Sequence, residues 1–470
     1  MKILVALLLP LSVLAKPLDL PSNSRIVLIG GGLGARMANF DHFETELHSR
    51  YPEHQLFIRN MCDEGNTPGF RPHSARKSPW AFPGAEKFQP LSDAKDRWGS
   101  GNVGNGFYKS PDEWLTTLKP DLIIGFFGYT DSFGGPQNLE SFKAELTGLI
   151  KHTAATTYNG KKPSRFILVS PTAFQNLSAL HGTPNGIEEN INLALYTNAM
   201  KEVAKEHKVP FVDVFTPTKQ WFEKDATPLT RDGALLTNAG YGKLAPLLAE
   251  SLFGGTKLEP DLDTMALRKA ISEKSWLWRN YYKIPNGVHV FGRRHRPHGP
   301  KNYPAELTKL AEMMHIRDKA VWAAPSTGLI DIAKADAQTS PLPNFGEPKK
   351  AYLPAIGTAK KIKVPEGYGI GLFASDEKFP DLANPVQLSF DNKGRLWVAT
   401  MPSYPHYKPG DAKPNDKLLI LEDTDNDGRA DKQTVFADGL HLPMGFEFGT
   451  DGVYVSQGYS LVHLRDTDGD

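Results

Sequence analysis

The stretch 25–36 constrains the fold of the first half of this chain more than any other segment. Residues 25–29 are aliphatic and mostly β-branched, with no charge after Arg25, which predicts a buried parallel strand. A run of glycines beginning at Gly30 follows and lets the backbone turn sharply into a helix. Ligands of open α/β sheets bind at the carboxyl ends of the strands, so we expect a site at this turn.

Length and charge narrow the class of protein. A chain of 470 residues is too long for one ordinary domain, so about two or three are expected. The 54 basic and 53 acidic residues nearly cancel, so the charge does not favour nucleic acid as a partner. The single cysteine, Cys62, excludes an intramolecular disulfide and a cysteine-built metal or haem site.

The first residues have the pattern of a secretory signal peptide. Lys2, an apolar run over 3–14 and the small residue Ala15 are its three parts, and they predict cleavage after residues 1–15 and a secreted or periplasmic protein. An uncleaved lipid-facing anchor is the alternative. No later segment has the roughly 18 apolar residues of a spanning helix, so we expect no membrane span in the mature protein.

Strand-like and helix-like segments alternate up to about residue 254. Such alternation predicts a three-layer α/β domain with a parallel sheet. The long segment 70–108, rich in Pro, Gly, Ser and Trp, interrupts the alternation and is typical of a functional or disordered loop. The expected strands are 25–29, 55–59, 121–127, 165–170 and 210–215, and the expected helices are 37–50, 138–151, 188–207 and 236–253.

Four motifs follow one another at the expected strand ends. They are the glycine turn at 29–34, Arg-Asn-Met-Cys-Asp-Glu-Gly-Asn-Thr at 59–67, Gly-Tyr-Thr-Asp at 128–131 and Asp-Gly-Ala-Leu-Leu-Thr-Asn-Ala-Gly-Tyr at 232–241. With these motifs, residues 24–255 resemble the SGNH (GDSL-like) hydrolase family. The segment 210–215 also resembles the family's strand before its last motif. The resemblance implies an α/β fold and an ester-hydrolysing ancestry.

The resemblance also implies a serine nucleophile, an oxyanion hole of a glycine N–H and an asparagine side chain, and an Asp–His pair. The nucleophile position is Gly32, the oxyanion glycine position is Cys62, whose N–H can still donate, and the oxyanion asparagine position is Thr130. The base position is Leu235, and only the aspartate, Asp232, is retained.

Members of a catalytic triad act as a unit, so their joint loss leaves at best ~10³–10⁴-fold acceleration over water. We therefore expect a catalytically silent SGNH-like domain that binds a small carbohydrate or acyl ligand. The expected ligand-binding residues are Gly31, Gly32, Thr130, Asp131 and Asp232.

Other interpretations of these residues stay open. An esterase or acylhydrolase with relocated groups would use Ser132 as a nucleophile and His181 as a base. Thr130, Asp131 and Asp232 can instead cap and brace loops.

The glycine turn also fits a dinucleotide-binding fingerprint. Residues 30–35 match G-x-G-x-x-G/A, which needs an acidic residue at the end of the second strand. Arg59 and Asn60 stand there instead, and Asp63 lies too far into the loop. An arginine can hold a 2′-phosphate, so NADP binding is a further alternative.

After residue 255 the pattern changes. Residues 256–335 form a helical connecting segment, with helices expected at 263–278 and 303–322, and 336–363 form a linker. The basic loop 292–299 between the helices can hold a phosphate or carboxylate, or simply form a solvated turn.

From residue 364 the pattern is that of short strands, expected at 395–400, 417–422, 452–456 and 460–464. An Asp-rich turn at 423 recurs at 466, a 43-residue shift that is typical of propeller blades. About one and a half blades are present where about four are needed to close a ring. Residues 364–470 are therefore expected to be the incomplete start of a β-propeller that contacts a missing C-terminal region.

This segment also carries a second resemblance. Residues 364–368, 384–387, 394–399 and 436–440 resemble the propeller of sugar-dehydrogenase-like proteins, especially large secreted ones with a haem-binding Cys-x-x-Cys-His module. The resemblance implies that the chain is the N-terminal part of a secreted redox enzyme. The chain has no Cys-x-x-Cys-His, so no haem is expected within it.

The Asp-rich turn itself predicts a metal site. Asp423, Asp425 and Asp427 alternate before a glycine, and Asp431 follows, which gathers the carboxylate oxygens that Ca²⁺ prefers. The closing glutamate of an EF-hand is absent, since Thr434 stands at that spacing. The alternative is a tight hairpin turn.

Overall fold

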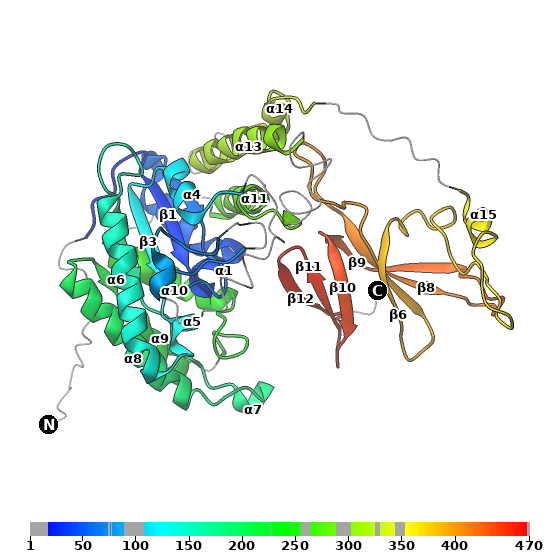
Figure 1. The fold of residues 1–470 in the computed structure, drawn as a ribbon, viewed down its shortest axis with the longest axis horizontal. Coiled ribbons are helices and arrows are strands. Elements are labelled where there is room, and N and C mark those ends of the chain that lie inside the picture. The colour runs from blue at the N-terminus through cyan, green and yellow to red at the C-terminus, as the bar shows by residue number, and fades with distance from the viewer. Residues whose placement is uncertain are drawn as a thin grey trace. The chain divides into compact units, whose positions relative to one another are not determined.

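The computed structural model describes residues 17–467 except 74–75, 77, 89–107, 226, 255–263, 288–301, 325–329 and 344–352. It forms two compact units (Figure 1). The first holds the described residues up to Tyr282 and Leu310–Thr339, and the second holds those of 283–290, those of 296–309 and those from Ser340 onward. The predicted signal peptide at 1–15 and the basic loop at 292–299 lie outside the described residues. No helix in the described part of the chain is both long and apolar enough to cross a bilayer.

The first unit is built on a five-stranded parallel sheet in the order β2-β1-β3-β4-β5. All five strands lie within the segments that the sequence predicts, apart from a one-residue extension at the end of β1 and of β2. This sheet with its helices fits the predicted α/β SGNH-like domain. The strands are β1 (Arg25–Gly30), β2 (Phe57–Asn60), β3 (Leu122–Phe126), β4 (Arg165–Val169) and β5 (Phe211–Val212).

The helix predicted at 37–50 is two helices, because Asp41 takes a left-handed conformation (φ 58°) that ends the first of them. Helix α4 was not predicted, although Ser110 and Glu113 form a reciprocal capping box at its start. The longer helices of this unit are α1 (Gly32–Phe40), α2 (His42–Arg50), α4 (Pro111–Leu118), α6 (Leu139–Ala155), α8 (Ile187–Glu206), α9 (Phe215–Lys224), α10 (Asn238–Phe253), α11 (Thr264–Tyr282) and, from Leu310, α13 (Tyr303–Ala323). The short ones are η1 (Pro52–His54), η2 (Ala85–Phe88), α5 (Tyr129–Ser132), η3 (Pro136–Asn138), α7 (Ser178–His181) and α14 (Ile332–Asp336).

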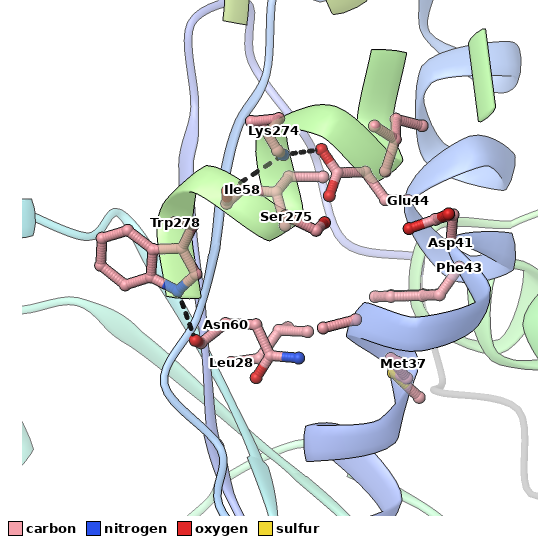
Figure 2. A pocket seen from close by; sticks show the side chains of 12 residues that line it. Leu28, Met37, Asp41, Phe43, Glu44, Ile58, Asn60, Lys274, Ser275 and Trp278 are labelled. Carbon is pink, nitrogen blue, oxygen red and sulfur yellow. Dashed lines mark hydrogen bonds and ion pairs between the residues drawn. The ribbon is translucent and has the colours of Figure 1, made fainter. Parts of the chain in front are cut away.

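The edge of the sheet at β2 is covered by side chains from α11 and α13. Trp278 Nε1 donates to the carbonyl of Asn60 (2.6 Å), and Lys274 Nζ to that of Ile58 (3.3 Å), as Figure 2 shows. Trp322 Nε1 donates to the carbonyl of Leu56 (2.9 Å). Every second carbonyl from Leu56 to Asn60 therefore has a donor, which blocks pairing of β2 with another strand. The first unit thus contains more of the chain than residues 24–255.

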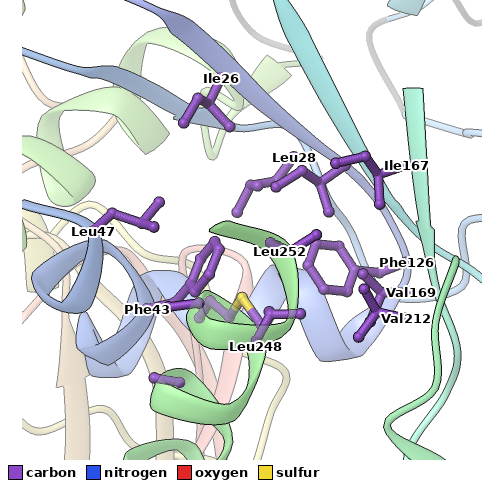
Figure 3. Close-up of a cluster of buried hydrophobic side chains, with 14 of the residues drawn as sticks. Ile26, Leu28, Phe43, Leu47, Phe126, Ile167, Val169, Val212, Leu248 and Leu252 are labelled. Atoms are coloured by element: carbon purple, nitrogen blue, oxygen red, sulfur yellow. The ribbon is translucent and has the colours of Figure 1, made fainter. Parts of the chain in front are cut away.

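One face of the sheet carries an extensive apolar cluster, where α2 and α10 cover the strands (Figure 3). Leu28 and Ile167 of the sheet meet Phe43 of α2 and Leu248 of α10 there. Successive side chains of a strand point to opposite faces, so the equally buried Val27 faces the other helical layer. The sheet is therefore covered on both faces, as the three-layer prediction requires.

The second unit is all-β apart from the short helix α15 (Ala355–Ala359) and the described residues at the start of α13. It has two antiparallel sheets, which share a cluster that includes Trp397, Ile420 and Phe446. Strands were predicted at the positions of β7, β8, β11 and β12, whereas β6, β9 and β10 were not. The sheets are β6 (Pro385–Phe390), β7 (Leu396–Thr400), β8 (Asp416–Glu422) and β9 (Lys432–Leu440), and β10 (Pro443–Phe448), β11 (Val453–Gln457) and β12 (Ser460–Leu464).

Candidate functional site

The glycine turn after β1 is fixed by two close approaches. Gly30 has a positive φ of 122°, and a Cβ there would overlap the carbonyl of Phe126. A Cβ at Gly34 would overlap the thiol of Cys62. At Gly32, by contrast, the nearest atom to a Cβ would be Cγ of Glu64 at 3.6 Å, an ordinary contact. The absence of a side chain at the nucleophile position is therefore not a packing requirement.

A cavity of about 150 Å³ opens beside this turn, at the carboxyl ends of the parallel strands. It has apolar walls and a few polar groups, and it brings together three of the predicted site residues, Gly32, Thr130 and Leu235. Its lining residues are Gly32, Leu33, Arg36, Glu64, Gly65, Tyr129, Thr130, Pro171, Thr172, Ala234, Leu235, Leu236 and Tyr241.

Asp232 shapes the last loop of the cavity rather than lining it. Its Oδ1 accepts hydrogen bonds from the backbone N–H groups of Ala234 (3.0 Å) and Leu235 (2.8 Å). This arrangement holds the loop that presents Leu235 to the cavity. The side chain at the predicted base position is a hydrocarbon and accepts no proton.

Asp131 also lies outside the lining. Its Oδ2 accepts from the N–H of Gly128 (3.0 Å), and burial, with a smaller effect of Glu145, raises the pKa of Asp131 to about 8. Gly31 donates its N–H to the carbonyl of Phe126 (2.7 Å), again as part of the loop structure.

The proposed relocated pair is not assembled at the cavity. Ser132 is buried, and its hydroxyl donates to the carbonyl of Tyr129 (2.7 Å). His181 is exposed at the end of α7. Neither residue lines the cavity.

The backbone N–H of Cys62 already has a hydrogen-bond partner, and its thiol is buried. Its N–H donates to Oδ1 of Asn60 (2.9 Å), so this donor is not directed at an oxyanion. Burial raises the pKa of the Cys62 thiol well above its ordinary value, which keeps it neutral and a poor nucleophile.

Arg59, the residue at which a dinucleotide 2′-phosphate would bind, is also engaged. Its guanidinium makes a two-pronged ion pair with Asp318, at 2.8 and 2.6 Å. This pairing leaves little reason to expect NADP at the glycine turn.

Several lining residues were missed at the sequence level. Arg36 lies one turn after Gly32 on α1, a spacing that places both on one side of the helix. Its Nη2 donates to the carbonyl of Leu236 (3.4 Å), and Tyr241 donates its hydroxyl to the carbonyl of Leu33 (2.9 Å). The four-residue spacing from Gly32 to Arg36 is the sequence pattern from which Arg36 could have been predicted as a lining residue.

The Asp-rich turn gathers three of its four predicted ligands. Single carboxylate oxygens of Asp423, Asp425 and Asp431 lie within 4.8 Å of one another. Asp427 is outside this group, and its Oδ1 accepts from the N–H of Arg429 (2.8 Å). The turn's own N–H groups already bond to Asp423 and Asp425, so the turn is held together without an ion.

Comparison with known proteins gives one family match and a set of structural likenesses. Residues 356–470 match the model of a domain of unknown function, DUF7133. No curated protein sequence matches the chain.

The structural likenesses cover about half of the chain. An alpha/beta hydrolase enzyme from the metagenome of Lake Arreo is 16% identical over 50% of this chain and 97% of its own, with a TM-score of 0.33. A catalytic mutant of an acetylxylan esterase from Geobacillus stearothermophilus is 16% identical over 52% and 100%, with a TM-score of 0.34. A Parabacteroides merdae protein described as a GDSL-like lipase is 13% identical over 52% and 100%, with a TM-score of 0.35. Likeness at this level indicates neither the reaction nor the substrate of the chain.

Proposed function

We propose that the first unit binds a small carbohydrate or acyl ligand in the cavity at the carboxyl ends of its strands and does not hydrolyse it. One observation carries the proposal: the described residues that line the cavity include no serine, cysteine or histidine. Covalent ester hydrolysis needs a nucleophile within reach of a base.

The lining suits such a ligand. Leu33 and Leu235 offer apolar surface for an acyl chain or the flat face of a sugar ring. The hydroxyls of Tyr129 and Thr130 and the guanidinium of Arg36 offer hydrogen bonds to hydroxyl or carbonyl groups.

A second candidate is an acyl hydrolase with relocated groups. Thr130 favours it, because this residue belongs to the cavity lining. Its hydroxyl oxygen lies 3.8 Å from the position that a Cβ on Gly31 would take. A threonine hydroxyl serves as a nucleophile when a base activates it. The described lining supplies no histidine, and its one carboxylate, Glu64, makes no hydrogen bond to Thr130, so the first proposal is favoured.

The test is hydrolysis of nitrophenyl acetate and butyrate by the full chain. A Gly32→Ser/Leu235→His variant rebuilds the missing pair, and Gly32→Ala/Leu235→Phe is its matched control without catalytic groups. We expect no turnover by the natural chain or the control, and measurable turnover by the rebuilt variant. Turnover by the natural chain that Thr130→Val abolishes would establish the second candidate instead.

Binding is measured separately, with N-acetylglucosamine as a probe that carries both a sugar ring and an acetyl group. Calorimetric titration of the full chain should show saturable binding, and Gly32→Phe, which fills the cavity, should abolish it. Equal binding by that variant would place the ligand elsewhere.

For the second unit, we propose blades of a sugar-dehydrogenase-like propeller in an exported protein. Two consecutive antiparallel sheets that share one apolar cluster support this proposal. A reading frame that continues into further blades and a Cys-x-x-Cys-His motif would support a redox enzyme, and a stop codon after Asp470 would contradict it. N-terminal sequencing of the mature protein tests export, with Lys16 as the expected first residue.

We also propose that the Asp-rich turn binds Ca²⁺ weakly, through Asp423, Asp425 and Asp431. The unfolding temperature should rise with added Ca²⁺, and Asp425→Asn should remove the rise. Asp427→Asn is the matched control, since its carboxylate lies outside the group. If Ca²⁺ raised the unfolding temperature of both variants equally, the Asp-rich turn would not be the Ca²⁺ site and would be only a tight hairpin turn.

A further inference from the structure

Two arginines of the first unit are buried and form no ion pair with a carboxylate of the described residues. Arg71 and Arg76 lie in the loop after β2, and they are 1% and 4% exposed. Arg71 Nη2 donates a long hydrogen bond to the carbonyl of Pro68 (3.4 Å). Arg76 donates to the carbonyl of Arg71 and to the hydroxyl of Tyr282 (3.0 Å). The Nε atom of each is buried and has no hydrogen-bond partner.

The surroundings of these two guanidinium groups are aromatic. Arg71 lies over the ring of Phe127 (5.7 Å to its centroid), and Arg76 lies over that of Tyr108 (5.3 Å). Cation–π contacts stabilise a guanidinium, but they do not neutralise its charge. Among the described residues, no carboxylate forms an ion pair with either arginine.

Other buried basic side chains of this unit form ion pairs with carboxylates. Arg59 pairs with Asp318 at 2.6 Å, Arg317 pairs with Asp336, and Lys274 pairs with Glu44. An unpaired charge in the interior costs several kcal/mol, which explains why these pairs exist. Arg71 and Arg76 are the most deeply buried arginines of the described chain and have no such pair, although Asp63 acts on Arg76 without forming an ion pair with it.

A buried carboxyl group can lose its charge by taking up a proton, but a buried arginine does not lose its charge in the same way. Asp41 is buried and has an unpartnered oxygen, but its pKa is raised to about 7, mainly by burial, so it can hold a proton. Burial, with a smaller effect of Arg76, lowers the pKa of Arg71 only to about 10. Burial lowers the pKa of Arg76 too, but Tyr282, Tyr108 and Asp63 outweigh this effect and raise it above its ordinary value. Both arginines therefore stay charged at neutral pH.

We propose that Arg71 and Arg76 form a binding site for a small oxyanion, a carboxylate or phosphate group, separate from the cavity. The unpaired N–H groups of two adjacent guanidiniums match the oxygens of such an anion, and binding supplies the missing negative charge. The inference does not depend on the function proposed for the cavity, because neither arginine lines it.

The experiment is thermal unfolding of the full chain at constant ionic strength, with chloride replaced stepwise by inorganic phosphate, sulfate or acetate. A site of this kind gives a saturable rise of the unfolding temperature, since the anion binds the folded state. Calorimetric titration then gives the dissociation constant. No saturable rise with any of the three anions would overturn the proposal.

The variants Arg71→Met and Arg76→Met should each weaken binding at least about tenfold, because each removes a charge-assisted partner. Arg429→Met, at an exposed arginine of the second unit, is the matched control and should bind normally. A rise that persists in both buried variants would also overturn the proposal.

The same variants separate a ligand site from a structural role. In chloride, Arg71→Met should unfold at the same or a higher temperature than the natural chain, because it removes an uncompensated charge. A lower temperature in chloride, with no anion effect in the natural chain, would assign the arginines a structural role instead. If Arg71→Met does not fold, Arg71→Lys is the alternative variant. It keeps the charge but lacks the paired N–H donors of a guanidinium, so it should still weaken binding.

Discussion

Asp41 illustrates how the environment of one residue decides its charge. It lies between α1 and α2, is 8% exposed and lines the small cavity shown in Figure 2. Burial raises its pKa to about 7, Glu44 adds to the rise, and Lys274, Arg268 and Arg279 act against it. The folded protein therefore binds a proton at pH values where the unfolded chain has released it.

This difference predicts a pH dependence of stability. The ordinary pKa of the group is 3.8, so between about pH 4 and pH 7 the contribution of Asp41 to stability falls as the pH rises. Asp41→Asn does not titrate, and asparagine tolerates the left-handed backbone found there. Its stability relative to the natural chain should grow by up to about 4 kcal/mol from pH 4 to pH 7.5, at ~1.4 kcal/mol per pKa unit. Urea unfolding at several pH values measures this, and a constant difference would refute it.

Two glycines of the first turn have different roles, and alanine variants separate them. A Cβ at Gly34 would overlap the Cys62 thiol, so Gly34→Ala should destabilise the protein by about 1–3 kcal/mol. Gly32→Ala meets only an ordinary contact at 3.6 Å and should change stability little. Chemical denaturation of the two variants tests this. If the two variants lost equal stability, the backbone conformation of the turn, and not the close contact with Cys62, would explain why glycine is needed at residue 34.

At the scale of elements, α11 is attached to α2 by a buried ion pair. Lys274 and Glu44 have side chains only 4% and 12% exposed. Burial alone would raise the pKa of Glu44, but Lys274 and His48 lower it to about 2. Trp278, four residues after Lys274 on α11, contacts the β2 edge.

Lys274→Met should therefore destabilise the protein by about 3–5 kcal/mol at pH 7, because it removes the ammonium partner of a buried carboxylate and leaves only His48 beside it. The loss should shrink as the pH falls and Glu44 takes up a proton. The double variant Lys274→Met/Glu44→Gln should recover most of the loss. Unfolding of the single and double variants measures both effects, and a double variant as unstable as the single one would count against the pair.

For the whole molecule, the first unit requires residues beyond 255. A chain of residues 17–255 lacks the donors to the β2 carbonyls, the partner of Arg59, and the apolar side chains Leu267 and Ile271. It should unfold at a lower temperature and aggregate more than a chain of residues 17–343, because its sheet edge is exposed. Thermal unfolding with light scattering tests this, and equal behaviour of the two chains would show that α11 and α13 are dispensable.

Local patterns in the sequence determine much of this fold. The β-branched run before Gly30 predicts a buried strand, and the spacing of apolar residues at 188–207 predicts an amphipathic helix; the structure has both. The alternation of such segments suffices to predict a parallel sheet, since few other connections are available. The same alternation places Gly32, Thr130 and Leu235 together, because parallel strands end at one edge.

Only the tertiary structure decides the rest, because it depends on contacts between distant residues. Nothing near Cys62 in the sequence reveals that its N–H is taken by Asn60 and its thiol packs on Gly34. Nothing near β2 reveals that residues more than 200 positions away cap its edge. The sequence also does not reveal that Arg71 and Arg76 are buried without an ion pair to a carboxylate of the described residues, since burial depends on what the folded chain brings around a side chain.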